Sequence, residues 1–136
     1  MDDIRKKAAL SLISPLSGFE RAKLEEFSEG HSLLTVEPDE GALNVHGIVH
    51  GGFLYTLSDI SAGMISCSLG KICVTLNSSF NFIKAARSGI LYFEANSMHC
   101  GRTTLTVDIK IRNQEDQLIA SGTFTMYLLG DLEKDR

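Results

Sequence analysis

The chain has 136 residues, of which 43% are hydrophobic and 22% are charged, and its formal net charge is -4. This length suits a single domain with one core, and the composition excludes a disordered chain. The negative charge and the lack of a basic tract argue against nucleic acid as a partner.

The first elements in the chain are a short helix and a β-hairpin. Residues 3–13 predict an amphipathic helix with Ile4, Ala8 and Leu12 on one side, and Pro15 is expected to end it. The pattern over 19–27 is ambiguous between helix and strand. A tight turn at Ser-Glu-Gly and a strand over 32–36 then favour a hairpin.

A long helix is expected from Gly51 to Leu69. Its apolar side chains do not alternate and the stretch exceeds the usual strand length. They point to nearly every side, which predicts a helix buried all round, and about 18 residues would span roughly 27 Å. Asp59 lies two turns into this helix, where a carboxylate needs a partner or a purpose, because burying it alone is costly.

After Gly70 the periodicity changes to two, which predicts strands. The strand over 72–82 would place five apolar side chains on one face and Thr75 on the other. The five are Ile72, Val74, Leu76, Phe80 and Phe82. Further strands are predicted over 90–99, 104–112 and 118–129.

The order of elements predicts an α+β fold. A helix that is apolar on all sides needs cover, and one strongly curved antiparallel sheet wrapped around it would supply that cover. Such a sheet leaves long strand edges and an apolar flank, so we expect self-association. The predicted organisation is an N-terminal extension with a short helix over 1–18, a main domain over 19–130 and a charged tail over 131–136.

Other features indicate where the protein works. Three cysteines follow no metal-ligand spacing and are odd in number, so neither a metal site nor a disulfide framework is expected. The N-terminus has no apolar segment of the kind found in signal peptides. The apolar stretch from Ile48 carries His50, Asp59 and five Ser or Thr residues, so it is a poor membrane span. We therefore expect a cytoplasmic protein with no membrane partner.

One segment resembles a known signature. Residues 44–52 have the pattern N-x-x-G-x-x-H-G-G, and an aspartate follows after six more residues. This pattern resembles the signature of the PaaI-like hotdog-fold acyl-CoA thioesterases, whose fold is a curved antiparallel sheet around one long central helix. The resemblance implies hydrolysis of an acyl- or aryl-CoA thioester to the free acid and coenzyme A. It implies no cofactor and no metal ion, and a homodimer or homotetramer.

The resemblance also implies catalytic roles, each of which has a plainer structural alternative. Asp59 would be the general base or the nucleophile, or else a carboxylate capped by Ser58 or Ser61. The Gly51 N–H would polarise the thioester carbonyl at the positive end of the helix. Alternatively, Gly51 and Gly52 merely make a tight turn.

Three more residues complete the predicted catalytic set. Asn44 would hold the carbonyl or the attacking water, although asparagine also commonly ends turns. Thr75 would orient the water, or be an ordinary threonine on the sheet surface. His50 belongs to the motif, or is a satisfied loop histidine. In the family, Asn44 and Gly51 of one subunit would face Asp59 and Thr75 of the other.

Coenzyme A binding is predicted for Gly52 and for three cations, Lys84, Arg87 and Arg102. A cationic strand end could hold the phosphates of coenzyme A, although such residues are most often solvated surface charges. The rival hypothesis is a non-catalytic acyl-CoA-binding module, as in hotdog domains that sense lipid precursors and regulate transcription. That hypothesis predicts an attached DNA-binding segment, and eighteen leading residues without a basic helix-turn-helix pattern are too few for one.

Overall fold

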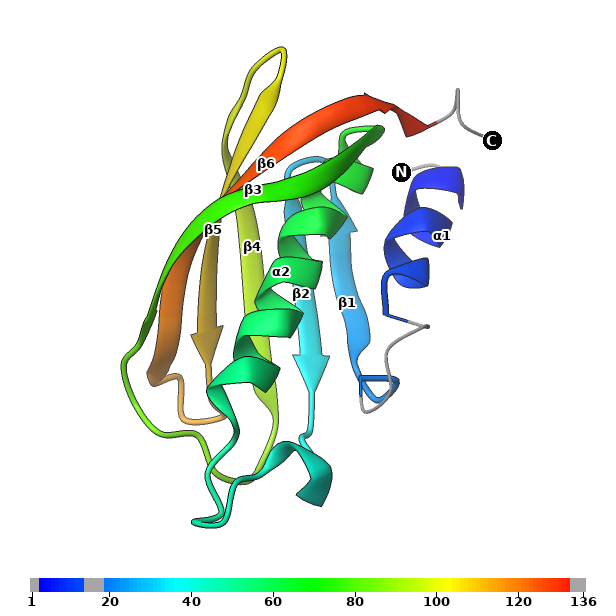
Figure 1. Ribbon diagram of the computed structural model, residues 1–136. Helices are drawn as coiled ribbons and strands as arrows, with labels where there is room; N and C mark the ends of the chain where they lie inside the picture. The colour runs from blue at the N-terminus through cyan, green and yellow to red at the C-terminus, as the bar shows by residue number, and fades with distance from the viewer. Residues whose placement is uncertain (1–2, 14–18, 133–136) are drawn as a thin grey trace.

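The computed structural model describes residues 3–13 and 19–132, and within them six antiparallel strands form one sheet that curves around α2 (Figure 1). The strand order is β1-β2-β4-β5-β6-β3, so β1 and β3 lie at the two edges. The elements are α1 (Asp3–Ser11), β1 (Lys23–Ser28), β2 (His31–Val36), η1 (Glu40–Ala42), α2 (Gly51–Ser68), β3 (Lys71–Phe82), β4 (Leu91–Cys100), β5 (Thr104–Arg112) and β6 (Leu118–Asp131). The predicted α+β class and the wrapped helix are confirmed.

Helix α2 has the predicted length, 18 residues. It ends where Gly70 adopts a left-handed φ of 75° and its N–H bonds to Cys67 O at 2.9 Å, a glycine C-cap. Leu57, Met64 and Ile65 point into the core and are fully buried. These residues face the sheet, so most of the core lies between α2 and the strands.

The expectation that α2 is buried all round is wrong for the single chain. Gly52 is exposed, the Tyr55 side chain is 38% exposed, and Asp59 and Gly63 are half-buried. These positions are three or four residues apart, so they form one stripe along the helix. The sheet curves around only one side of α2, and this stripe lies on the side it leaves uncovered.

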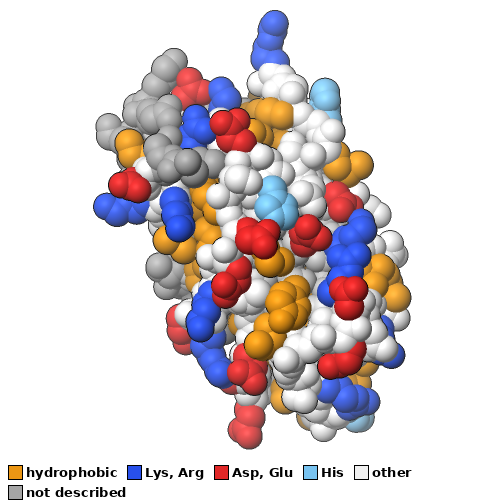
Figure 2. Space-filling view, turned by 180° about the vertical axis from the view of Figure 1, so that it is seen from behind, with side chains coloured by type: hydrophobic (Ala, Val, Ile, Leu, Met, Phe, Trp, Pro, Cys, Tyr) orange, Lys and Arg blue, Asp and Glu red, His pale blue; other side chains and the backbone are white. Residues whose placement is uncertain are grey.

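Most of the predicted strands are confirmed. The β1–β2 hairpin turns at Glu29 and Gly30, and Gly30 has a φ of 79°. Strand β5 alternates as expected, with Leu105, Val107, Ile109 and Ile111 fully buried. The outer face of the sheet, seen from behind in Figure 2, carries interspersed acidic and basic side chains. Examples are the ion pairs Lys110–Asp108 at 3.0 Å and Arg112–Glu94 at 3.8 Å.

The predicted faces of β3 are wrong for Val74, Leu76 and Thr75, whereas Phe80 and Phe82 contact α2 residues as predicted. The register against β6 shifts between Thr75 and Asn77, so Leu76 is an extra residue in the strand. Val74 and Leu76 are 50% and 58% exposed, whereas Thr75 points toward α2. Ser78 also points toward α2, because its hydroxyl bonds to the Tyr55 hydroxyl. A bulge reverses the side-chain alternation after it, which a strict period of two does not anticipate.

The chain ends of the described region pack more closely than expected. Helix α1 lies against α2, with Ala8 and Ala9 buried, but Ile4 is 43% exposed and does not belong to the contact face as predicted. Strand β6 continues to Asp131, and Leu132 is 7% exposed. The expected helix stop at residue 15 and the tail at 133–136 lie outside the described residues.

Candidate active site

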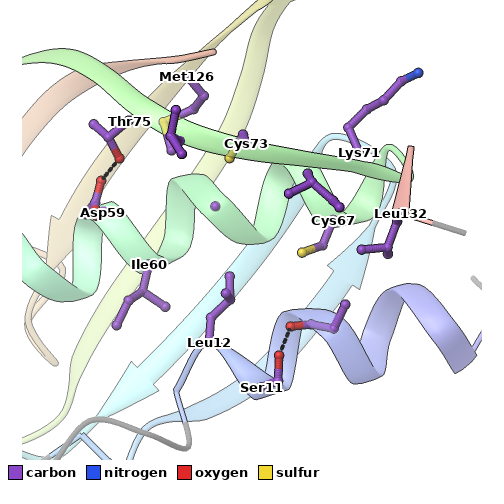
Figure 3. A pocket seen from close by; sticks show the side chains of 14 residues that line it. Ser11, Leu12, Asp59, Ile60, Cys67, Lys71, Cys73, Thr75, Met126 and Leu132 are labelled. Carbon is purple, nitrogen blue, oxygen red and sulfur yellow. Dashed lines mark hydrogen bonds between the residues drawn. The ribbon is translucent and has the colours of Figure 1, made fainter. Parts of the chain in front are cut away.

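Asp59 is half-buried and bonds to a residue of β3. The Thr75 hydroxyl donates to Asp59 Oδ1 at 2.5 Å (Figure 3). The alternative caps are occupied elsewhere, because Ser58 and Ser61 donate to the carbonyls one turn earlier in α2, Leu54 O and Leu57 O, both at 2.8 Å. The carboxylate and hydroxyl therefore form one polar pair at the open side of the helix.

The loop before α2 is fixed by Asn44. Its side-chain Oδ1 accepts from the backbone N–H groups of His46 at 2.8 Å and Ile48 at 3.1 Å. Gly47, at the tip of the loop, has a φ of 71°, which suits glycine. This carboxamide thus has the structural role that asparagine has in turns. It also carries two N–H donors, and those are the groups that could hold a carbonyl or a water.

Gly51 begins α2 beside this loop. The first N–H groups of a helix have no carbonyl one turn earlier to bond to, and they carry the positive end of the dipole. A Cβ at position 51 would lie 3.2 Å from two ring carbons of Phe82, so only glycine fits without displacing that ring. Asn44, Gly51, Phe82 and Lys84 line one pocket of about 290 Å³.

The two groups of predicted catalytic residues do not meet within one chain. Gly51 and Asp59 are eight residues apart on α2, which is about 12 Å along the axis. Asp59 and Thr75 line a different groove, of about 760 Å³. We call the pocket with Asn44 and Gly51 the loop half-site, and the pair of Asp59 and Thr75 the carboxylate half-site. The two half-sites of one chain are too far apart to contact the same carbonyl.

His50 and Gly52 face elsewhere. His50 is the N-cap of α2, although its side chain makes no capping hydrogen bond. Both residues line a third groove, of about 640 Å³, with Phe19, Phe53 and Thr56. A Cβ at position 52 would meet open space, so close packing does not require a glycine there.

The three predicted cations lie at two ends of the sheet. Lys84 is exposed and lines the loop half-site. The Arg87 guanidinium donates to His46 O at 3.3 Å, so it braces the same loop. Arg102 lies in the β4–β5 turn, at the end of the sheet where β3 begins, far from Lys84 in the same chain.

Two features of the carboxylate half-site were not predicted from the sequence. Tyr55 lies one turn before Asp59, and its hydroxyl bonds to Ser78 of β3. Cys73 lines the same groove as Asp59, and burial raises the pKa of its thiol above the ordinary value. The four-residue spacing from Tyr55 to Asp59 could have placed both on one helix face. Cys73 and Ser78 could not be placed at this half-site from the sequence, because the faces of β3 on which they lie depend on the bulge between them.

Residues 3–13 and 19–132 contain neither a candidate metal site nor a candidate membrane-spanning helix. No three His, Cys, Asp or Glu side chains there are grouped so that they could hold a metal ion. None of the helices in this part of the chain has the length and apolar composition that crossing a bilayer requires.

Comparison with known proteins identifies the family. The family model described as the thioesterase superfamily matches residues 46–120, more than half of the chain. A hypothetical thioesterase from Streptococcus pneumoniae TIGR4, solved with coenzyme A, has a TM-score of 0.86 and 36% identity, covering 92% of this chain and 97% of that chain. The chain therefore belongs to the thioesterase superfamily, as a PaaI-like protein with the hotdog fold.

Two further relatives are informative. The protein smu.793 from Streptococcus mutans UA159, solved bound to acetyl CoA, is 37% identical with a TM-score of 0.81, covering 87% of this chain and 96% of that one. The acyl-coenzyme A thioesterase PaaI of Escherichia coli K12 is 30% identical over 93 residues, which are 68% of this chain and 66% of PaaI.

Proposed function

We propose that the protein hydrolyses an acyl-CoA thioester to the free acid and coenzyme A. The observation that carries this proposal is the pairing of Thr75 with Asp59 at the edge of a largely apolar groove. Coenzyme A and acetyl CoA bound to the two streptococcal relatives support the substrate class. The Streptococcus pneumoniae relative has also been solved with an aspartate and, separately, a threonine replaced, and these two residues have the same sequence separation as Asp59 and Thr75.

In the proposed reaction, Asp59 acts as a general base. Its carboxylate takes a proton from a water while the water oxygen bonds to the thioester carbon, and Thr75 orients that water. The carbonyl oxygen becomes an oxyanion, which the Gly51 N–H stabilises with the Asn44 amide beside it. The C–S bond then breaks, and the coenzyme A sulfur takes the proton from the Asp59 carboxylic acid.

Asp59 could instead attack the carbonyl carbon directly. Its oxygen would then form a mixed anhydride as coenzyme A leaves, and water would cleave the anhydride in a second step. The two routes differ in where water oxygen can enter. In the general-base route it enters only the product acid, whereas water that attacks the aspartyl carbon of the anhydride leaves its oxygen in Asp59. Label in the peptide around Asp59 after a single turnover in ¹⁸O water, detected by mass spectrometry, would therefore identify the nucleophilic route.

We further propose that a second copy of the chain completes each site. The half-sites of one chain are about 12 Å apart along α2, so the loop half-site of one subunit would face the carboxylate half-site of its partner. Strand β3 is at the sheet edge, with Val74 and Leu76 exposed on it, and the part of the α2 stripe that carries Tyr55 and Asp59 runs alongside. A two-fold dimer would cover both.

A panel of acyl- and aryl-CoA substrates, assayed for release of free thiol, tests the proposed hydrolysis. We expect turnover of at least one substrate without an added metal ion or other cofactor. Tight binding of acyl-CoA without turnover of the whole panel would contradict hydrolysis and favour the binding-module hypothesis. The assignments of His50, Gly52, Arg87 and Arg102 to substrate binding or catalysis stay predictions.

A further inference from the structure

Helix α1 and Leu12, which directly follows it, are fixed against α2 from Arg5 onward. Leu12 approaches Gly63 so closely that a Cβ at position 63 would lie 3.2 Å from Leu12 Cδ1. Ala8 and Ala9 are buried between the helices. At the other end, the Arg5 guanidinium donates to Ser68 O at 3.1 Å, at the negative C-terminus of α2. This helix is therefore packed as part of the domain, although it precedes the family match at 46–120.

Helices α1 and α2 and strand β3 line the groove that contains Asp59 (Figure 3). The Asp59–Thr75 pair lies at one end of the view, and Cys67 and Leu132 lie toward the other end. Asp59, Gly63 and Cys67 are four residues apart along α2, so the groove follows that helix for about 12 Å. Leu12, which directly follows α1, contributes to the facing wall.

The lining beyond Asp59 is apolar in character. Ile60, Cys67, Met126 and Leu132 contribute to it, and the Ser11 hydroxyl is directed to its own helix, donating to Ala8 O at 2.7 Å. The Lys71 ammonium, also at this groove, bonds to Asp131 at 2.5 Å. A ligand in the groove would therefore bury apolar surface rather than exchange hydrogen bonds.

We propose that this groove is the acyl subsite, that it takes a linear aliphatic chain, and that Leu12, which directly follows α1, is a specificity-determining residue for chain length. This rests on the hydrolysis proposed above, because a thioester carbonyl held at Asp59 directs its acyl group along the groove. A groove that extends along α2 suits a flexible alkyl chain better than a compact aryl ring. Helix α1, outside the matched family segment, sets how much of the chain is enclosed.

Leu12→Ala and its matched control Leu10→Ala test the subsite. Leu10 lies two residues earlier, in α1, but is 41% exposed and is not part of the groove lining. We expect the ratio of kcat/KM for decanoyl-CoA over acetyl-CoA to fall about tenfold in Leu12→Ala, because apolar contact with the chain is lost. The same ratio should be unchanged in Leu10→Ala. Turnover with equal ratios in Leu12→Ala and the wild type would overturn the proposal.

A second measurement does not depend on turnover. S-decyl-CoA is a thioether that the enzyme cannot hydrolyse, so its Kd can be compared with that of coenzyme A by calorimetry. We expect S-decyl-CoA to bind more tightly than coenzyme A, and Leu12→Ala to weaken S-decyl-CoA about tenfold but leave coenzyme A unchanged. This result without hydrolysis of any acyl-CoA would sustain the subsite and reject the proposed reaction. Equal Kd values for the two ligands in the wild type would mean that a second copy or another segment fills the groove, and would overturn the subsite.

Discussion

The two half-sites of the proposed active site consist of different kinds of chemical group. The loop half-site uses backbone groups and turn residues, namely the N–H of Gly51 and the loop that Asn44 ties together. The carboxylate half-site uses two side chains, Asp59 and Thr75, on neighbouring regular elements. A loop site depends on residues close together in sequence, whereas the carboxylate site depends on how α2 packs on β3. The first can therefore be recognised from a short motif, and the second only from the folded chain.

Replacing Asp59 should have the largest effect and test the carboxylate half-site directly. Asp59→Asn keeps the size and removes the basicity, so we expect kcat to fall by about 10² to 10⁴, with little change in KM. The thermal unfolding midpoint should be almost unchanged. Asp108→Asn, which alters only a surface pair with Lys110, is the control and should keep full activity. A wild-type rate in Asp59→Asn would reject the proposed mechanism.

Replacing Thr75 should have the next largest effect on activity, because its hydroxyl is bonded to the Asp59 carboxylate. Thr75→Val keeps the shape but removes the hydrogen bond to Asp59, which for a charged acceptor corresponds to a loss of about tenfold to a hundredfold in kcat/KM. Thr75→Ser restores the hydroxyl and should recover most of the activity. A Ser variant as slow as the Val variant would mean that the methyl group, and not the hydroxyl, matters here.

The sequence predicted the local features of the molecule well. The length of α2, the alternation of β5 and the position of the Gly51 turn all follow from nearby residues. Thr75 was placed on the wrong face, since the extra residue at Leu76 carries no glycine or proline to mark a bulge. The docking of α1 on α2 was not predicted either, because it depends on contacts between residues that are distant in the sequence. Arg5 bonds to Ser68, 63 residues away, and no periodicity within 3–13 indicates that contact.

Replacing Lys84, which lines the loop half-site, should have a smaller effect than replacing Asp59 or Thr75. The effect should be on KM, whereas changes in the carboxylate half-site should mainly lower kcat. If Lys84 binds the phosphates of coenzyme A, Lys84→Ala should raise KM by up to about fivefold, because an exposed ion pair contributes little. The increase should be larger at low salt and absent for a truncated thioester without the nucleotide. Lys110→Ala, on the outer face of the sheet, is the control. An equal increase for both substrates would assign Lys84 a structural role.

The protonation of His31 should have the smallest effect. This residue lies away from both half-sites, so we expect a change in the stability of the fold and not in activity. Hydrogen bonds to Glu26 and then to Asn96 raise its pKa above the ordinary 6.5. Because the folded-state pKa is raised, the stabilisation is fully present below about pH 6.5 and is lost as the pH rises through the folded value. The melting temperature should drop by about 1 to 3 °C as the pH rises from below 6.5 to above the folded-state pKa of His31. In His31→Gln this drop should be smaller. A difference scan of the two proteins checks this, and identical pH profiles would contradict it.

Complementation between two inactive variants tests the shared site most directly. Asn44→Asp keeps the oxygen that ties the loop but removes the amide donors, and Asp59→Asn removes the base. Co-expressed with different affinity tags, the two variants should form mixed dimers in which one site has both wild-type residues and the other has neither. With random pairing, we predict recovery of about a quarter of the wild-type activity, because half of the dimers are mixed and each has one intact site. Purified mixed dimers with no activity above that of either variant alone would contradict a site completed by the partner.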